Sequence, residues 1–318
     1  MSRPQPQVGV DSVPPTGGEQ SEGLNLGLMA TALTEFGVAS ATTRLRDVLV
    51  KRPGHAFGAA FDNPSFGYTG PVDLAHAQKE HDNLVKTLEG LGVRVHSLDV
   101  ERDHDPDLVY VFDPLLITDR GAIPLFPGKP GRRGEESTLE DWTREAGIPT
   151  VGAIAEPGTV EGGDTVWLRE GLFCIGRSLR TNDAGAQQLA ALVEGEVRIF
   201  DLPYWRGEAE LIHLMSVISP VADDLAVVFM PFMPAGLFDL LQTLGIRRIE
   251  VPEEEYATLG CNGLAVAPGV VVVAEGNPVT RRALEASGCE VHAVELSEVG
   301  GKGSGGVTCL TRPVLRRS

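Results

Sequence analysis

A repeated pattern with a period of about 50 residues constrains the fold of this chain more than any other feature. Five times, an apolar stretch with helical spacing ends at a glycine, and a short strand-like segment that closes on or near an acidic residue follows. The glycines are Gly92, Gly147, Gly195, Gly245 and Gly288, at spacings of 55, 48, 50 and 43 residues. Self-similarity at a fixed period is typical of repeat architectures. The sequence therefore predicts five copies of one αβ unit.

Each unit is expected to run strand, strand, helix, strand, and the fifth copy is the clearest. Two β-branched runs meet at Pro268-Gly269, which predicts a hairpin. Asn277 and Pro278 have the composition of a helix start, and Gly288 suits the left-handed residue that ends a helix. The segment after Gly288 is then the returning strand.

The other units follow the same order. Hairpin turns are expected at residues 222–224 in the fourth unit and 169–171 in the third, and a returning strand over 148–154 in the second. A last strand, residues 307–315, is left over and would complete the sheet of the first unit. Such closure removes free sheet edges. An open stack of units, or two unrelated α/β domains, is the alternative.

A second series runs in phase with the glycines. Its members are Asp113, Glu161, His213, Asn262 and Cys309, separated by 48, 52, 49 and 47 residues. If the five units close into a ring, residues at one phase of the repeat meet at one place. The sequence therefore predicts an active site that holds carboxylates, an imidazole and a thiol.

The residue types in this series suit chemistry on a planar cation. Cys309 follows a glycine-dense loop and is the candidate nucleophile, and His213 is the natural proton carrier near neutral pH. Glu161 and Asp164 flank two glycines, and Asp113 lies in an apolar strand, where a carboxylate needs a cationic partner. Carboxylates bind a guanidinium group well. An inert buried thiol, a core histidine and turn-forming acids are the ordinary alternatives.

Composition narrows the class of protein. With 27 basic and 44 acidic residues the formal charge is −17, which argues against nucleic acid or an anionic membrane as partner. Residues 1–26 are polar and rich in Pro and Gly, so we expect a disordered tail, followed by a single catalytic domain over 27–318. Four scattered cysteines without a CxxC pair disfavour a zinc site and favour a reducing, cytoplasmic compartment.

The motifs along the chain resemble those of the guanidino-group-modifying, or pentein, superfamily. From about Gly37 to Pro313, the matching segments are YVFDP, RRGE, EGGD, SLRTN, IHL and GSGGVTCLTRP. Members include arginine deiminases, dimethylarginine dimethylaminohydrolases and amidinotransferases. The resemblance implies a five-bladed α/β propeller of ββαβ units, a small guanidino substrate and no cofactor or metal. Whether the chain forms a homodimer is left open.

The resemblance also implies residue roles. Cys309 would be the nucleophile that forms a covalent thiouronium, His213 the general acid and base, and Glu161 the carboxylate that holds the guanidinium beside His213. Asp113 and Asp164 would complete this grip. Arg132 in RRGE and Arg180 in SLRTN match the arginines that clasp a substrate carboxylate.

One position departs from part of the superfamily. Arginine deiminases and many amidinotransferases have HLD where this chain has His213-Leu214-Met215. The dimethylaminohydrolases also lack that Asp, and its loss favours an alkylated guanidine over free arginine.

The predicted function is hydrolysis of a guanidino C–N bond in methylated arginine or arginine. Arginine deiminase proper, an amidinotransferase and a non-catalytic binding module are the alternatives.

Overall fold

The computed structural model describes residues 33, 35–205 and 212–318. The tail predicted over residues 1–26 lies outside the described residues, as does the start of the domain predicted from residue 27.

The first seven strands are β1 (Leu45–Val50), β2 (Arg94–Ser97), β3 (Leu115–Thr118), β4 (Gly121–Pro124), β5 (Thr165–Arg169), β6 (Leu172–Arg177) and β7 (Glu196–Asp201). The others are β8 (Ile218–Ala222), β9 (Leu225–Val228), β10 (Arg247–Glu250), β11 (Gly263–Ala267), β12 (Val270–Ala274), β13 (Glu290–Val294) and β14 (Arg312–Arg316).

Seven α-helices are described between these strands. They are α1 (His55–Gly58), α2 (Leu74–Gly90), α3 (Glu135–Glu145), α4 (Asp183–Leu192), α5 (Ala235–Thr243), α6 (Glu253–Tyr256) and α7 (Pro278–Ala286). No helix in the described part of the chain is long and apolar enough to cross a membrane.

Three sheets repeat one topology, as the period predicts. In β5-β6-β7, β8-β9-β10 and β11-β12-β13, a hairpin pairs the first two strands, and the third returns parallel to the second. The predicted hairpin turns are confirmed at residues 169–171, 222–224 and 268–269. In the fifth unit, α7 begins at Pro278, and Gly288 has a φ of +92°, as expected for the residue that ends the helix.

The first sheet draws on both ends of the described chain. Strand β14 pairs antiparallel with β1, with Leu49 opposite Arg312, and β1 pairs parallel with β2. The sheet order β14-β1-β2 thus reproduces the topology of the other units, with β14 supplying the strand that the first unit lacks. The predicted closing strand is confirmed from Arg312 onward, whereas residues 307–310, which include Cys309, form a turn before it.

The second sheet departs from the expected pattern. It contains β3 and β4 alone, and the described residues 148–154 form no strand beside them. A single bridge joins Ala122 to Thr150, and the amide of Val151 donates to the carbonyl of Ala122 at 2.9 Å. Pro124 has no N–H to donate to the carbonyl of Val151, so the bridge does not extend into a regular ladder. The prediction of a full returning strand in this unit is wrong.

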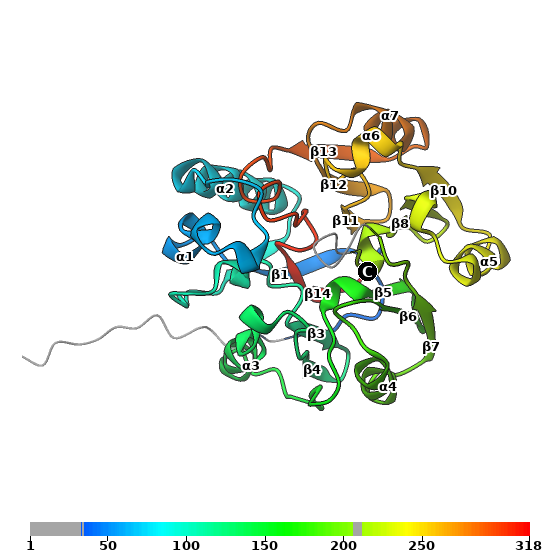
Figure 1. Cartoon of the computed structure of the whole chain (residues 1–318). Helices are drawn as coiled ribbons and strands as arrows, with labels where there is room; N and C mark the ends of the chain where they lie inside the picture. The colour runs from blue at the N-terminus through cyan, green and yellow to red at the C-terminus, as the bar shows by residue number, and fades with distance from the viewer. Residues whose placement is uncertain (1–32, 34, 206–211) are drawn as a thin grey trace, which may run out of the picture. The chain divides into compact units, whose positions relative to one another are not determined.

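The inner strands of neighbouring sheets contact one another. Strand β11 contacts β8 and β1, and β14 contacts β3. Figure 1 shows β1, β3, β5, β8, β11 and β14 gathered in the middle of residues 35–318, with the longer helices outside them. Apolar faces fill the space between helix and sheet: Leu84 and Leu88 of α2 are fully buried in one cluster with Val48 of β1. The sheets thus bring their first strands to a common centre, where the candidate site lies.

A buried carboxylate on α2 anchors the loop that leads to Cys309. Glu80 is 1% exposed and accepts hydrogen bonds from the amides of Glu298 and Val299, at 2.9 and 2.7 Å, and from the hydroxyl of Ser297 at 2.7 Å. The residues it holds are more than 200 positions away in the chain. An acceptor that satisfies several buried donors is costly to lose, because each donor would stay unpaired.

We expect Glu80→Gln to lower the free energy of unfolding by about 2–3 kcal/mol, because an amide replaces one acceptor oxygen with a donor facing other donors. Urea unfolding measures this difference. The matched control is Glu89→Gln on the exposed face of the same helix, for which we expect a change of about 0.5 kcal/mol or less. Equal stability of the two variants would contradict the anchoring role.

Candidate active site

Glu161 is the centre of a convergent polar site. It is fully buried and lies at the N-terminal end of a short 3-10 turn, Gly162–Asp164, that leads into β5. Its Oε2 lies 3.1 Å from Nε2 of His213, and its Oε1 accepts the amide of Lys129 at 3.0 Å. Nη1 of Arg180 donates to both carboxylate oxygens, at 2.9 and 3.0 Å. The carboxylate is therefore shared by an imidazole and a guanidinium.

The two glycines after Glu161 explain how the site can be so compact. A side chain at Gly162 would overlap the carbonyl of Phe112, and one at Gly163 would overlap the ring of His213. The amide of Gly163 donates to Oδ1 of Asp113 at 2.8 Å. Backbone therefore takes the space between the imidazole and the second carboxylate, which no larger residue allows.

Charge compensation sets the ionisation of the central pair. Burial opposes the charge on Glu161, but the hydrogen bond from His213 and the charge of Arg180 outweigh it and hold the pKa of Glu161 below its usual range. Burial also works against the charged imidazole, yet Asp164, Glu161 and Asp113 together raise the pKa of His213 to about 9. At neutral pH the pair is an imidazolium and a carboxylate.

Asp113 is held in a buried ion network. Its Oδ2 accepts Nη1 of Arg132 at 2.6 Å, and Arg132 in turn donates from Nε and Nη2 to Glu135, at 2.8 and 2.7 Å. Nη2 of Arg132 also faces the carbonyl of Tyr110 at 3.2 Å. All three nitrogens of the Arg132 guanidinium thus have protein acceptors, and the contacts of Arg132 orient Asp113. Arg132 and Arg180 thus bind different carboxylates, Asp113 and Glu161, although the charges of both act on Glu161.

Asp164 anchors the turn that carries His213. It is fully buried, its Oδ1 accepts the amide of Leu214 at 3.0 Å, and its Oδ2 accepts the hydroxyl of Ser178 at 2.6 Å. Burial raises the pKa of Asp164 to about 6. Both oxygens of Asp164 are therefore engaged by the protein, next to His213.

Cys309 ends the glycine-rich loop and lies beside Asn262. Nδ2 of Asn262 donates to Sγ of Cys309 at 3.7 Å, and Oδ1 of Asn262 accepts the amide of Thr308 at 3.0 Å. A side chain at Gly306 would overlap Asn262, and one at Gly305 would overlap the ring of Tyr110. The loop glycines therefore allow close packing against the protein's own side chains.

The resting thiol is in its neutral form. Burial, followed by the negative charge of Asp113, raises the pKa of Cys309 to about 11. Asp113 also acts on His213, so the thiol and the imidazole share one carboxylate in their electrostatic environment. A cation placed here would favour the thiolate.

Members of the in-phase series contact one another or the turn beside them, and other partners come from outside the series. Glu161 and His213 meet, Asp113 meets the EGGD turn, and Asn262 meets Cys309. Asn262 has no predicted role in the site, although its place in the repeat matches. Lys129, which contributes a backbone amide, and Ser178, which holds Asp164, carry no sequence signal of their own.

The described residues hold one group able to bind a metal ion, and it lies elsewhere. His76, Glu80 and Glu295 form it, and Glu80 is already bonded to the loop at residues 297–299. None of the candidate catalytic side chains belongs to this group.

The chain is similar in sequence to dimethylarginine dimethylaminohydrolases and to arginine deiminases. A family model described as eukaryotic N,N dimethylarginine dimethylhydrolase matches residues 63–316. The N(G),N(G)-dimethylarginine dimethylaminohydrolase of Pseudomonas aeruginosa is 31% identical, over 79% of this chain and 93% of that protein. The arginine deiminase of Mycobacterium marinum is 28% identical, over 93% of this chain and 84% of its own.

The fold points to the same family. A solved mutant of the Pseudomonas aeruginosa enzyme, complexed with citrulline, matches with a TM-score of 0.70 and 28% identity, over 86% of this chain and 100% of that one. The amidinotransferase SxtG of Microseira wollei matches with a TM-score of 0.71 at 18% identity, which bears on the fold alone. The dimethylarginine dimethylaminohydrolase and arginine deiminase relatives support a hydrolase that acts on C–N bonds in linear amidines. The chain belongs to the dimethylarginine dimethylaminohydrolase family, within the pentein superfamily.

Proposed function

We propose that this protein hydrolyses a C–N bond of a methylated arginine through a covalent intermediate on Cys309. One observation carries the proposal: the buried carboxylate of Glu161 already binds a guanidinium, that of Arg180, while it also faces His213. A site that holds one guanidinium on a buried carboxylate suits another on a substrate.

The substrate's guanidinium takes the place of Arg180 on Glu161. Arg180, which is 18% exposed at its side chain, is then free to turn toward the substrate's carboxylate, so one charged contact replaces another. Arg132 acts as a positioning residue for Asp113. Asp164 holds the turn of His213 in place, and Asn262 orients the thiol.

The chemistry needs no group beyond these side chains. The bound cation lowers the pKa of Cys309, the thiol loses its proton to solvent water, and the thiolate attacks the central guanidinium carbon. The C–N bond breaks, His213 gives its proton to the departing amine, and an S-linked thiouronium remains. His213 then takes a proton from water, which attacks the same carbon. The C–S bond breaks, which restores the thiolate and releases a ureido product such as citrulline.

Met215 favours an alkylated substrate. In the arginine deiminases the corresponding HLD motif supplies a carboxylate, and here the thioether is 7% exposed and apolar. A dimethylated nitrogen has no N–H to leave unpaired against such a surface, whereas the free nitrogen of arginine does. The named activity of the 31% identical relative agrees with this preference.

The proposal also covers the architecture of the domain and the compartment in which the protein acts. The five sheets are the blades of a closed propeller, with one catalytic domain over residues 27–318. The four cysteines are free, which suits a reducing, cytoplasmic compartment. The lack of a nucleic-acid partner stays a prediction from the charge, and homodimer formation stays open.

A substrate screen tests the function. Asymmetric dimethylarginine, monomethylarginine, arginine and agmatine are incubated with the enzyme, and mass spectrometry scores ureido product and released amine. We expect citrulline with dimethylamine or methylamine, and little ammonia from arginine. Cys309→Ser is the control and should abolish turnover while circular dichroism stays unchanged. Retained turnover in Cys309→Ser, or an amidino group passed to added glycine or lysine in place of water, would overturn hydrolysis by this scheme.

Glu161→Gln should reduce kcat/KM on the order of 10³-fold, because a neutral amide neither holds the cation nor pairs with the imidazolium. Steady-state kinetics measures the ratio. The matched control is Glu156→Gln, an exposed carboxylate nearby in the chain, which should leave kcat/KM within a factor of two. A Glu161→Gln enzyme with near-normal rates would remove Glu161 from the mechanism.

Asp113→Asn should speed the alkylation of the free enzyme at Cys309 several-fold at pH 8–9. The charge of Asp113 raises the pKa of the thiol, so its removal leaves more thiolate at a given pH. Peptide mass spectrometry after iodoacetamide treatment follows the rate, with Asp119→Asn in the exposed turn after β3 as control. An unchanged or slower rate in Asp113→Asn would contradict this electrostatic assignment.

A further inference from the structure

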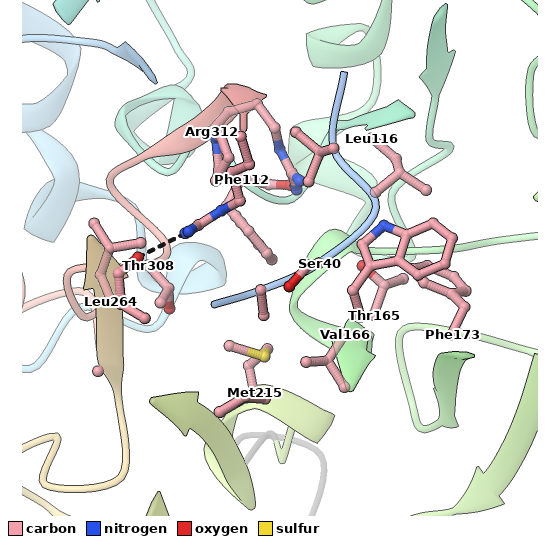
Figure 2. A pocket seen from close by; sticks show the side chains of 18 residues that line it. Ser40, Phe112, Leu116, Thr165, Val166, Phe173, Met215, Leu264, Thr308 and Arg312 are labelled. Atoms are coloured by element: carbon pink, nitrogen blue, oxygen red, sulfur yellow. Dashed lines mark hydrogen bonds between the residues drawn. The ribbon is translucent and has the colours of Figure 1, made fainter. Parts of the chain in front are cut away.

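A small cavity, here called the arginine cavity, is lined by residues that adjoin those of the candidate site in the chain. Its lining includes Phe112, Thr165, Met215, Gly263 and Thr308. Each lies next to a residue of the site or of the in-phase series, or two positions from it. The cavity has a volume of about 50 Å³, and Figure 2 shows side chains from several strands and loops facing it.

Two arginines of β14 line this cavity, and both are buried. Arg312 is 2% exposed and Arg316 is 7% exposed. Arg316 donates from Nη1 to the carbonyl of Thr43 at 2.6 Å and from Nη2 to that of Ala265 at 2.8 Å. Arg312 donates to the carbonyl of Phe112, and its guanidinium lies 3.7 Å from the centre of the Phe112 ring. The partners of both guanidinium groups are neutral.

The cavity gathers buried donors that have no acceptor. The described part of the chain has seven buried side-chain atoms without a hydrogen-bond partner, and three of them belong to residues that line this cavity. They are Nε of Arg312, Nε of Arg316 and Nε1 of Trp167, and each is an N–H donor. A donor without a partner in a protein interior costs about 1–3 kcal/mol. Three donors and no free acceptor call for a ligand that accepts.

The charges around the cavity also favour a ligand that accepts hydrogen bonds. Among the described residues that line it, none carries a carboxylate. Asp113 is the one acid whose charge acts on Arg312, and its Oδ2 is bonded to Arg132. Burial lowers the pKa of both Arg312 and Arg316 to about 9, so both remain charged at neutral pH. Two buried positive charges without their own counter-charge are strongly unfavourable.

We propose that the arginine cavity binds a small monovalent anion, of the size and polarisability of a halide, between Arg312 and Arg316. The anion accepts the free Nε–H groups and neutralises charge that the protein leaves uncompensated.

The size and the walls of the cavity select this class of anion. One water molecule needs about 10–15 Å³, so a volume of about 50 Å³ has room for a halide or a few waters. Leu116, Val166, Phe173 and Leu264 supply apolar walls, which suit a weakly hydrated ion better than a tetrahedral dianion with many acceptor oxygens. Water is the competing occupant, and the experiment separates it from an anion.

Crystals grown without halide and then soaked in sodium bromide test the proposal directly. Bromide scatters anomalously and water does not. We expect an anomalous peak within hydrogen-bond distance of Nε of Arg312 or Arg316. An empty anomalous map in the cavity, with electron density that fits water, would overturn the proposal whatever the variants do.

Thermal unfolding gives an independent measurement in solution. Bromide should raise Tm saturably, by about 2–5 °C over sodium gluconate at equal ionic strength, because gluconate is too large for the cavity. Arg316→Met should lose this saturable rise, as should Arg312→Met. The matched control is Arg281→Met, an exposed arginine on α7 paired with Glu285, which should keep it. Equal Tm in both salts for the wild-type protein, or a rise retained by both cavity variants, would contradict anion binding.

Discussion

The burial of the Glu161 carboxylate is the constraint on which the rest of the site depends. A carboxylate that is fully shielded from water needs compensation on both oxygens, and it receives this from an imidazole, a guanidinium and a backbone amide. Those partners come from three separate segments of the chain. The need to neutralise one charge therefore fixes where His213, Arg180 and the segment at Lys129 must lie.

The buried carboxylates also set the pKa values of His213 and Cys309. The pKa of His213 is raised because carboxylates surround it, and that of Cys309 is raised because burial and Asp113 act against the thiolate. A positively charged ligand changes both balances at once. Under the proposed mechanism, the thiol is poorly reactive in the empty site and becomes reactive when a cation binds, which limits its oxidation or alkylation between turnovers.

Much of this arrangement could be predicted from the period of the sequence. Positions about 50 residues apart take equivalent places in successive units, so Glu161 meets His213 and Asn262 meets Cys309. The neighbours of a charged side chain are harder to predict. Spacing cannot tell that Glu135, three residues after Arg132, captures its guanidinium and turns it toward Asp113. Nor does the polar end of the chain suggest that Arg312 and Arg316 are buried, because the segments that cover them, at Phe112 and at Ala265, are distant in sequence.

The pairing of β14 with β1 also has a consequence for the order of folding. Leu49 and Arg312 are paired in the sheet although almost the whole domain separates them in sequence. Among the strand pairs described, this one closes the longest loop of chain, so it has the largest entropic cost of loop closure. Local units such as the β11–β12 hairpin and α7 form without it. Docking of the last strand therefore comes late, and it brings Cys309 to acids that are already assembled. Until that strand docks, the thiol of Cys309 lies outside the buried, acidic surroundings that raise its pKa in the folded protein.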